Sequence, residues 1–289
     1  MIYVFLSICC SVVVSILLKL ARRYQIDIFQ AITWNYSIAI LLTWIFLKPQ
    51  LHNLHAAPFY IYSLLGLLLP SLFVVIAISV RYTGIVRTEV AQRLSLFIPI
   101  IAAFLLFGEQ VTALKIIGIG LGFAAIICSI PWQKDRYKTK KTPSNAWVYL
   151  LVVFIGMGVI DILFKQMALF KGVSYPTSLF LVYFIAFILA LIGLVYMFIT
   201  KKSKFSWPHI MFGWILGIAN FGNILFYLKA HQALANNPSI VFSAMNIGVI
   251  VLGAFVGLLI FREKLSRLNK VGIVLAIIAI IVIYYPQIF

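Results

Sequence analysis

The chain has 289 residues, of which 64% are hydrophobic and 10% charged, and its mean hydropathy is +1.12. Soluble proteins carry charge on about a quarter of their residues, so this composition excludes a soluble globular protein and predicts an integral membrane protein. The net charge of +17 does not indicate nucleic-acid binding, because the basic residues lie in short connections between apolar runs, where they would face lipid headgroups.

Ten apolar runs are long enough to cross a hydrocarbon core of about 30 Å as helices. We place them at residues 2–20, 29–47, 59–80, 88–107, 111–130, 146–170, 176–200, 208–230, 238–260 and 268–285. The sequence therefore predicts an all-α polytopic membrane protein with ten transmembrane helices and no soluble domain.

The second, third and fourth runs contain polar or helix-breaking residues at membrane depth. Asn35, beside Trp34, carries an amide that needs a partner in lipid. Pro70 and Pro99 each remove a helical hydrogen bond. Backbone groups freed in this way must be satisfied by protein or by water, so both prolines are predicted markers of a cavity. A packing kink without a ligand is the alternative.

Glu89 and Arg93 lie four residues apart at the start of the fourth run, where they can pair on one helix face. An ion pair at the membrane interface is the simpler interpretation. Arg93 is also a candidate for substrate binding, because a guanidinium matches the geometry of carboxylate and phosphate. Glu89 is a candidate proton-coupling group.

The sixth run carries two ionisable residues. Asp161 lies deep in the run and Lys165 follows one turn later, so the two side chains can pair. Ionisable residues at this depth mark an ion or substrate pathway by default, which makes Asp161 a candidate for proton coupling and both residues candidates for substrate binding. The alternative is a structural salt bridge, with Lys165 extending towards the interface.

The eighth and ninth runs contribute three further amides. Asn220 and Asn223 share a helical face in the eighth run, and Asn246 lies in the ninth. Such side chains need partners inside the bundle. We therefore expect these amides to contribute to the substrate site together with Asn35.

The two halves of the chain are similar in sequence. Residues 107–130 align with residues 261–284 at a constant offset of 154, with nine identities in 24 positions, and earlier segments align at offsets of 146 or 147. The sequence predicts a first five-helix repeat at 1–130, a basic linker loop at 131–145 and a second repeat at 146–289. Because five is odd, the second repeat would be inverted in the membrane.

Helix-breaking residues fall at matching positions of the two repeats. Pro70 corresponds to Gly217, and Pro99 corresponds to Gly253. Paired interruptions of this kind are among the better sequence indications of a transport site. The four residues are therefore predicted to mark a central cavity.

The basic residues are distributed unequally between the two predicted sides of the membrane. One side carries 17 Lys and Arg residues and the other carries four. The positive-inside rule then places the basic linker in the cytoplasm and both termini outside. We expect the protein in a cytoplasmic (inner) membrane of the bacterial type.

Each repeat ends with a short turn before a glycine-bearing helix, Phe-Gly-Glu at 107–109 and Phe-Arg-Glu at 261–263. With ten short helices in two repeats, the stretch that ends at Pro99, and a lysine late in the first helix of each repeat, the chain resembles the EamA type of the drug/metabolite transporter superfamily. The resemblance implies a carrier that exports or exchanges small metabolites through a site in the middle of the bundle. It also implies cytoplasmic termini, opposite to the charge distribution, and Arg262 stands where glycine is usual.

The leading hypothesis is a secondary transporter, an exporter or exchanger of small polar or amphipathic metabolites such as amino acids. It would work by alternating access around a central cavity, with Asp161 or Glu89 as the proton-coupling group. The alternative is a translocase of lipid-linked or amphipathic cargo, because 15% aromatic residues would suit an apolar groove. A third hypothesis, a membrane enzyme that uses His231 and acidic residues, lacks a polar cluster dense enough for acid-base catalysis.

The sequence contains no nucleotide-binding glycine loop, zinc motif or Ser/His/Asp arrangement. We therefore expect no enzymatic activity, no cofactor and no metal. The expected partners are a small-molecule substrate and membrane lipids, without nucleic acid, and the chain is expected to act as a monomer or homodimer.

Overall fold

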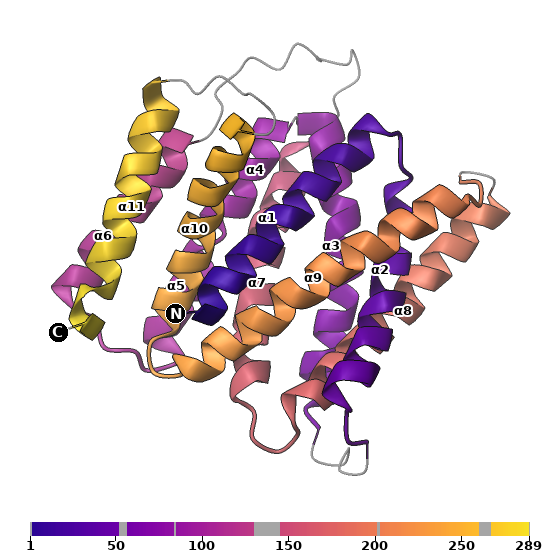
Figure 1. The fold of residues 1–289 in the computed structure, drawn as a ribbon, viewed down its shortest axis with the longest axis horizontal. Helices are drawn as coiled ribbons and strands as arrows, with labels where there is room; N and C mark the ends of the chain where they lie inside the picture. The colour runs from indigo at the N-terminus through magenta and orange to yellow at the C-terminus, as the bar shows by residue number, and fades with distance from the viewer. Residues whose placement is uncertain are drawn as a thin grey trace.

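The computed structural model describes residues 2–51, 57–83, 85–129, 145–200, 203–259 and 267–288. Within these ranges the chain forms helices and the connections between them, without a strand (Figure 1). The helices are α1 (Ile2–Arg23), α2 (Ile28–Leu42), the π-helical turn η1 (Thr43–Leu47), α3 (Phe59–Thr83), α4 (Ile85–Leu94), α5 (Phe97–Leu105), α6 (Ala113–Ser129), α7 (Trp147–Leu169), α8 (Tyr175–Ile199), α9 (Trp207–Ala233), α10 (Pro238–Leu259) and α11 (Arg267–Ile288).

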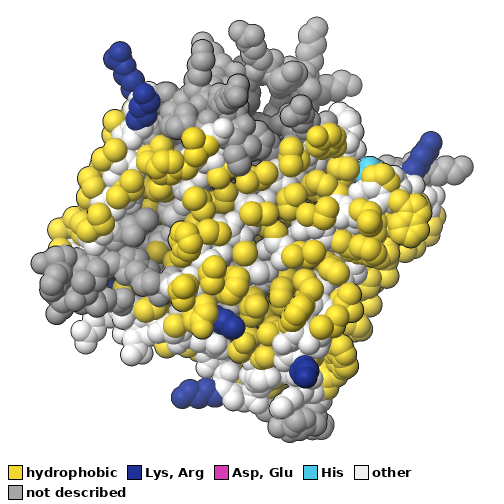
Figure 2. Space-filling view, viewed as in Figure 1, with side chains coloured by type: hydrophobic (Ala, Val, Ile, Leu, Met, Phe, Trp, Pro, Cys, Tyr) yellow, Lys and Arg dark blue, Asp and Glu magenta, His cyan; other side chains and the backbone are white. Residues whose placement is uncertain are grey.

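Five of the described helical segments are long and apolar enough to cross a membrane: Ile28–Leu47, Phe59–Ile76, Trp147–Leu169, Tyr175–Ile199 and Trp207–Ala233. Five shorter apolar helical stretches lie in α1, α4 with α5, α6, α10 and α11. Figure 2 shows a face covered largely by apolar side chains, with the few visible Lys and Arg side chains mostly towards its edges. A surface of this kind suits lipid rather than water, so the protein is a membrane protein.

The apolar run expected to form one helix over 88–107 forms two. Ser95 and Leu96 separate α4 from α5, and Pro99 lies in the first turn of α5, where its missing N–H costs no helical hydrogen bond. The carbonyl of Ser95, four residues before the proline, accepts a hydrogen bond from the Ile98 amide at 3.0 Å. The backbone group that Pro99 frees is therefore satisfied by a local turn.

Pro70 does not end its helix. It is buried inside α3, which continues on both sides of it. The hydroxyl of the next residue, Ser71, donates to the carbonyl of Leu67 at 2.6 Å. Two prolines in similar sequence contexts thus have different outcomes, an uninterrupted helix and a break.

Helix α9 is the longest described helix, with 27 residues, and lies across the bundle against α1, α2 and α7 (Figure 1). Helix α3 packs against α7 and α8 in the other half of the chain. Helices α6 and α11 pair with each other at one edge of the molecule. The contacts that assemble the bundle therefore join the two halves of the chain rather than neighbours in sequence.

The contact between α2 and α9 depends on two glycines one turn apart on α9. A Cβ atom added to Gly213 would lie 2.7 Å from the Ala31 carbonyl oxygen, and one added to Gly217 would lie 2.1 Å from Ile38 Cγ2 and 2.6 Å from the Asn35 carbonyl oxygen. Small residues at this spacing allow two membrane helices to approach at backbone distance. Gly217, predicted as a cavity marker, lies at this helix contact.

We expect Gly217→Ala to destabilise the protein by about 1–3 kcal/mol, the usual cost of overpacking a tight contact. The same change at Gly193 is the matched control, because a Cβ atom there meets nothing within 4 Å. The measurement is thermal unfolding of the purified protein in detergent. Equal unfolding temperatures for the two variants would contradict the tight α2–α9 contact.

Candidate functional site

The connection between α5 and α6 places a carboxylate at the beginning of α10. Glu109 is 4% exposed and accepts hydrogen bonds from the Ser239 amide at 2.8 Å and from the Ser239 hydroxyl at 2.5 Å. Ser239 lies in the first turn of α10, where helical N–H groups lack partners and the helix dipole favours negative charge. Glu109 therefore caps a helix from the other half of the chain.

Gly108 directs Glu109 towards α10. It adopts a left-handed conformation with φ of 63°, which residues with a Cβ atom rarely adopt. The amide of Glu109 donates to the Ala103 carbonyl in the last turn of α5 at 3.1 Å, which holds the turn against the end of that helix. This turn explains the Gly-Glu pair that the sequence carries after the fourth apolar run.

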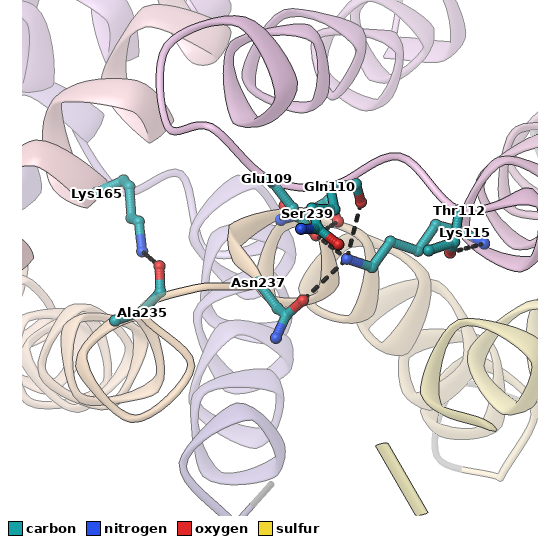
Figure 3. Close-up of polar contacts among 8 residues, drawn as sticks. All are labelled: Glu109, Gln110, Thr112, Lys115, Lys165, Ala235, Asn237 and Ser239. Carbon is teal, nitrogen blue, oxygen red and sulfur yellow. Dashed lines mark hydrogen bonds and ion pairs between the residues drawn. The ribbon is translucent and has the colours of Figure 1, made fainter. Parts of the chain in front are cut away.

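Lys115, near the start of α6, completes the cluster around the α10 cap. Its ammonium lies 2.9 Å from Glu109 Oε1, and it donates to the Asn237 side-chain oxygen at 2.9 Å and to the Gln110 carbonyl at 3.2 Å (Figure 3). The side chains of Lys115 and Glu109 are 9% and 0% exposed. This is a buried ion pair within the first half of the chain, and its hydrogen bonds to Asn237 and Ser239 join it to the second half.

Lys165 on α7 is fully buried close to this cluster. Its ammonium donates to the Ala235 carbonyl at 2.8 Å (Figure 3). The ammonium also lies 5.8 Å from the centre of the Phe107 ring. Ala235 follows the end of α9, where carbonyl groups lack helical partners and a cation is favoured. Among the described residues, Ala235 supplies the one hydrogen-bond acceptor of an ammonium that can donate three.

Asp161 and Lys165 do not form the expected ion pair. Both residues are described, and no contact within 4.0 Å joins their charged atoms. Instead, Asp161 accepts a hydrogen bond from the hydroxyl of Tyr227 on α9 at 2.9 Å. The physical reason is that α7 packs against α9, which offers each side chain a separate partner in the apolar interior.

His231 is the least satisfied polar side chain in this region. It has no solvent exposure, and neither ring nitrogen has a hydrogen-bond partner among the residues that the structure describes. Its ring lies against Tyr227, with ring centres 4.6 Å apart, and against Phe242 of α10 at 4.8 Å. A buried polar atom without a partner costs about 1–3 kcal/mol, so a side chain with two such atoms calls for an explanation.

These residues form a continuous patch between α7 and α9, which we call the α7–α9 patch: Asp161, Lys165, Tyr227 and His231. Tyr227 and His231 lie one turn apart on α9, as do Asp161 and Lys165 on α7. The patch lies inside two helices that are apolar enough to cross a membrane. It combines one carboxyl, one ammonium, one phenol and one imidazole.

The other predicted amides lie at separate places. Asn223 accepts a hydrogen bond from Ser7 of α1 at 2.9 Å, and Asn246 donates to the carbonyl of Phe242 at 3.1 Å. Asn223 precedes Tyr227 by one turn, and Phe242 contacts His231, so both amides adjoin the α7–α9 patch. Asn220 is half-buried on α9.

Trp34 and Asn35 lie on α2, against the glycine contact with α9. The indole nitrogen of Trp34 and the side-chain oxygen of Asn35 are buried without hydrogen-bond partners. Arg93 is half-buried in the last turn of α4. Trp34 and Asn35 lie on α2 and Arg93 lies on α4, so none of the three belongs to the helices of the α7–α9 patch.

Two of the predicted features, the side chain of Glu89 and the turn at 261–263, lie outside the described residues. Gly253 lies in α10, and a Cβ atom added to it would meet nothing within 4 Å.

No protein-family model matches the chain. An uncharacterized protein of Haemophilus influenzae is 43% identical over 286 residues, which cover 96% of this chain and 96% of that protein. The chain belongs to the family of that protein. A protein of known crystal structure superposes with a TM-score of 0.77 over 97% of this chain and 94% of its own length. At 11% identity, that match shows a shared fold alone.

Sequence reasoning singled out Asp161 and Lys165 and missed Tyr227 and His231 as members of the same patch. The eighth run was expected to end at residue 230, which put His231 at the membrane interface, whereas α9 continues to Ala233. The i, i+4 spacing of Tyr227 and His231 with Asn223 was a signal that could have found them.

We expect Glu109→Gln to destabilise the protein by about 3–5 kcal/mol, because it leaves the buried Lys115 ammonium without its counter-charge. The double variant Glu109→Gln with Lys115→Met should recover much of this loss, because the uncompensated charge is then absent. Chemical unfolding in detergent measures the stability of Glu109→Gln, of Lys115→Met and of the double variant. A double variant whose loss equals the sum of the two single losses would contradict a coupled pair.

Proposed function

We propose that the protein is a secondary transporter of small polar or amphipathic metabolites that works by alternating access around a central site. The observation that carries the proposal is the α7–α9 patch, in which a fully buried lysine and a buried histidine without partners lie within apolar helices. Ionisable groups at membrane depth are costly, so their presence favours a role in moving a solute or an ion.

The pairing of helices supports an inverted repeat of five helices. If α1, α2, α3, α4 with α5, and α6 correspond to α7, α8, α9, α10 and α11, exchanging the halves converts most of the extensive pairings into other observed pairings or into themselves. The contact of α2 with α9 becomes that of α8 with α3, and the contact of α1 with α9 becomes that of α7 with α3. The α2–α8 and α6–α11 pairs convert into themselves.

Individual contacts follow the same exchange. Gly217 on α9 packs against Ile38 of α2, and Gly66 on α3 packs against Ile185 of α8, where an added Cβ atom would lie 2.5 Å from Ile185 Cγ2. Ile38 and Ile185 are related by the sequence offset of 147. Equivalent isoleucines thus meet glycines on equivalent helices, which supports ten membrane spans arranged about a two-fold axis in the membrane plane.

The positions of the chain ends support the predicted topology. Figure 1 shows the two termini towards one end of the bundle, whereas the end of α6 and the beginning of α7 lie at the other. The charge distribution then places the 131–145 linker in the cytoplasm and both termini outside a cytoplasmic (inner) membrane of the bacterial type. In this orientation Glu109, Lys115 and the α9–α10 connection lie near the outer surface.

We expect proteoliposomes that contain the protein to take up at least one solute from a mixed pool of radiolabelled amino acids and small metabolites. Lys165→Met should lower that uptake about tenfold or more, because one charge-assisted hydrogen bond to a bound solute is lost. Lys171→Met is the matched control, because Lys171 is exposed in the connection after α7. Equal uptake by the two variants, or no uptake by the unmodified protein, would contradict the proposal.

We expect Asp161→Asn to abolish the response of uptake to an imposed pH gradient, because an amide cannot carry the coupled proton. Solute exchange without a gradient should persist. Tyr227→Phe removes the hydrogen bond to Asp161 but keeps its carboxyl group, so it should alter the response without abolishing it. Uptake that responds to the gradient equally in Asp161→Asn and the unmodified protein would reject Asp161 as the coupling group.

A further inference from the structure

We propose that His231 and Lys165 together hold the carboxylate of a small organic anion whose body is apolar. The inference names the chemical class of the solute at the α7–α9 patch and in that respect rests on the proposed function. His231 enters as the residue that recognises the solute.

The register of α7 against α9 places His231 beside Lys165. Asp161 contacts Tyr227, and Lys165 contacts Ala235. Asp161 and Lys165 lie one turn apart on α7, and their partners lie in α9 and just after its end. His231 lies one turn after Tyr227 in the last turn of α9 and four residues before Ala235. Its ring is therefore on the side of α9 that faces α7, between the partner of Asp161 and the partner of Lys165.

The hydrogen-bonding capacity left over at these two residues matches a carboxylate. The His231 ring is fully buried with both nitrogens unpartnered, and the Lys165 ammonium has one acceptor for three donors among the described residues. Both therefore have N–H groups to donate. A carboxylate supplies two acceptor oxygens and a negative charge, whereas an ammonium would supply neither.

The acidic side chains nearby are occupied by other partners. Asp161 accepts from the Tyr227 hydroxyl, and Glu109 is held by Lys115 and by the first turn of α10. The ammonium of Lys165 thus lacks an ion-pair partner within 4.0 Å among the described residues. A bound carboxylate would provide this missing partner at membrane depth, where an uncompensated charge is costly.

Aromatic rings surround the two residues. His231 lies between Tyr227 and Phe242, Phe164 packs against Tyr227 with ring centres 6.2 Å apart, and Phe107 faces the Lys165 ammonium. These rings offer apolar surface and few hydrogen-bonding groups beside the charged end. The solute expected here is a monocarboxylate with a hydrocarbon body rather than a polyhydroxylated or phosphorylated compound.

The test compares solutes that share a body and differ in the charged end. Hydrocinnamate and hexanoate are each compared with the amide and the amine of the same carbon skeleton, by equilibrium dialysis against the purified full-length chain in detergent. We expect at least one carboxylate to bind about tenfold or more tightly than its amide and amine, the effect of a charge-assisted hydrogen bond. Equal binding of the three forms, or binding of neither carboxylate, would overturn the inference.

Variants assign the effect to residues. His231→Ala and Lys165→Met should each weaken carboxylate binding about tenfold or more, since each removes one charged or polar contact. His209→Ala changes a histidine near the other end of α9 and should leave binding unchanged. If His231→Ala does not fold, His231→Gln and nitrogen-labelled histidine NMR replace it. A His231 ring resonance that does not move on adding the bound carboxylate would refute its role.

Uptake into proteoliposomes separates this inference from the proposed function. If carboxylate binding depends on His231 but no solute is transported, the carboxylate site stands and the transporter proposal fails. If the protein transports amines or neutral amides but not their carboxylates, the transporter proposal stands and the carboxylate site is overturned.

Discussion

Polar groups inside this bundle depend on the protein, on water or on a bound solute for their partners, because lipid supplies none. Lys165 shows the constraint most clearly. It is fully buried on an apolar helix, and the group that it binds is a backbone carbonyl just beyond the end of α9. The packing of α9 against α7 must therefore bring this carbonyl to the Lys165 ammonium. The same packing sets the geometry of the patch.

Helix ends supply the complementary charge on both sides of a short connection. The carbonyl end of α9 accepts from Lys165, and the amide end of α10 donates to Glu109. A helix has negative partial charge at its carboxyl end and positive partial charge at its amino end, so each side chain meets the favourable pole. The helix ends thereby help to hold a buried cation and a buried anion, and Lys115 adds a counter-charge for Glu109.

The sequence predicted the membrane character of the fold and two members of the patch, for definite physical reasons. Long apolar runs indicate membrane helices directly, and Asp161 and Lys165 are conspicuous because charge is rare at that depth. Their partners could not be predicted. The contact of Asp161 with Tyr227 and that of Lys165 with Ala235 depend on the packing of α7 against α9, which no local pattern encodes.

Local sequence also left helix continuity undetermined. Pro70 and Pro99 looked alike, yet α3 continues through the first, whereas the chain turns before the second. Proline forbids one hydrogen bond but does not dictate whether the surrounding helix kinks or restarts, because neighbouring helices determine that outcome. The helix that Glu109 caps was equally beyond local sequence, because α10 lies in the other half of the chain.

The brevity of the α9–α10 connection has a mechanical consequence. Ala235 binds Lys165 and Asn237 binds Lys115, and two residues of chain span at most about 7 Å. A displacement that would carry the first turn of α10 beyond this span must pull on the carbonyl that binds Lys165. The buried Glu109–Lys115 pair and the Lys165 ammonium are therefore linked through this connection, and loosening one strains the other.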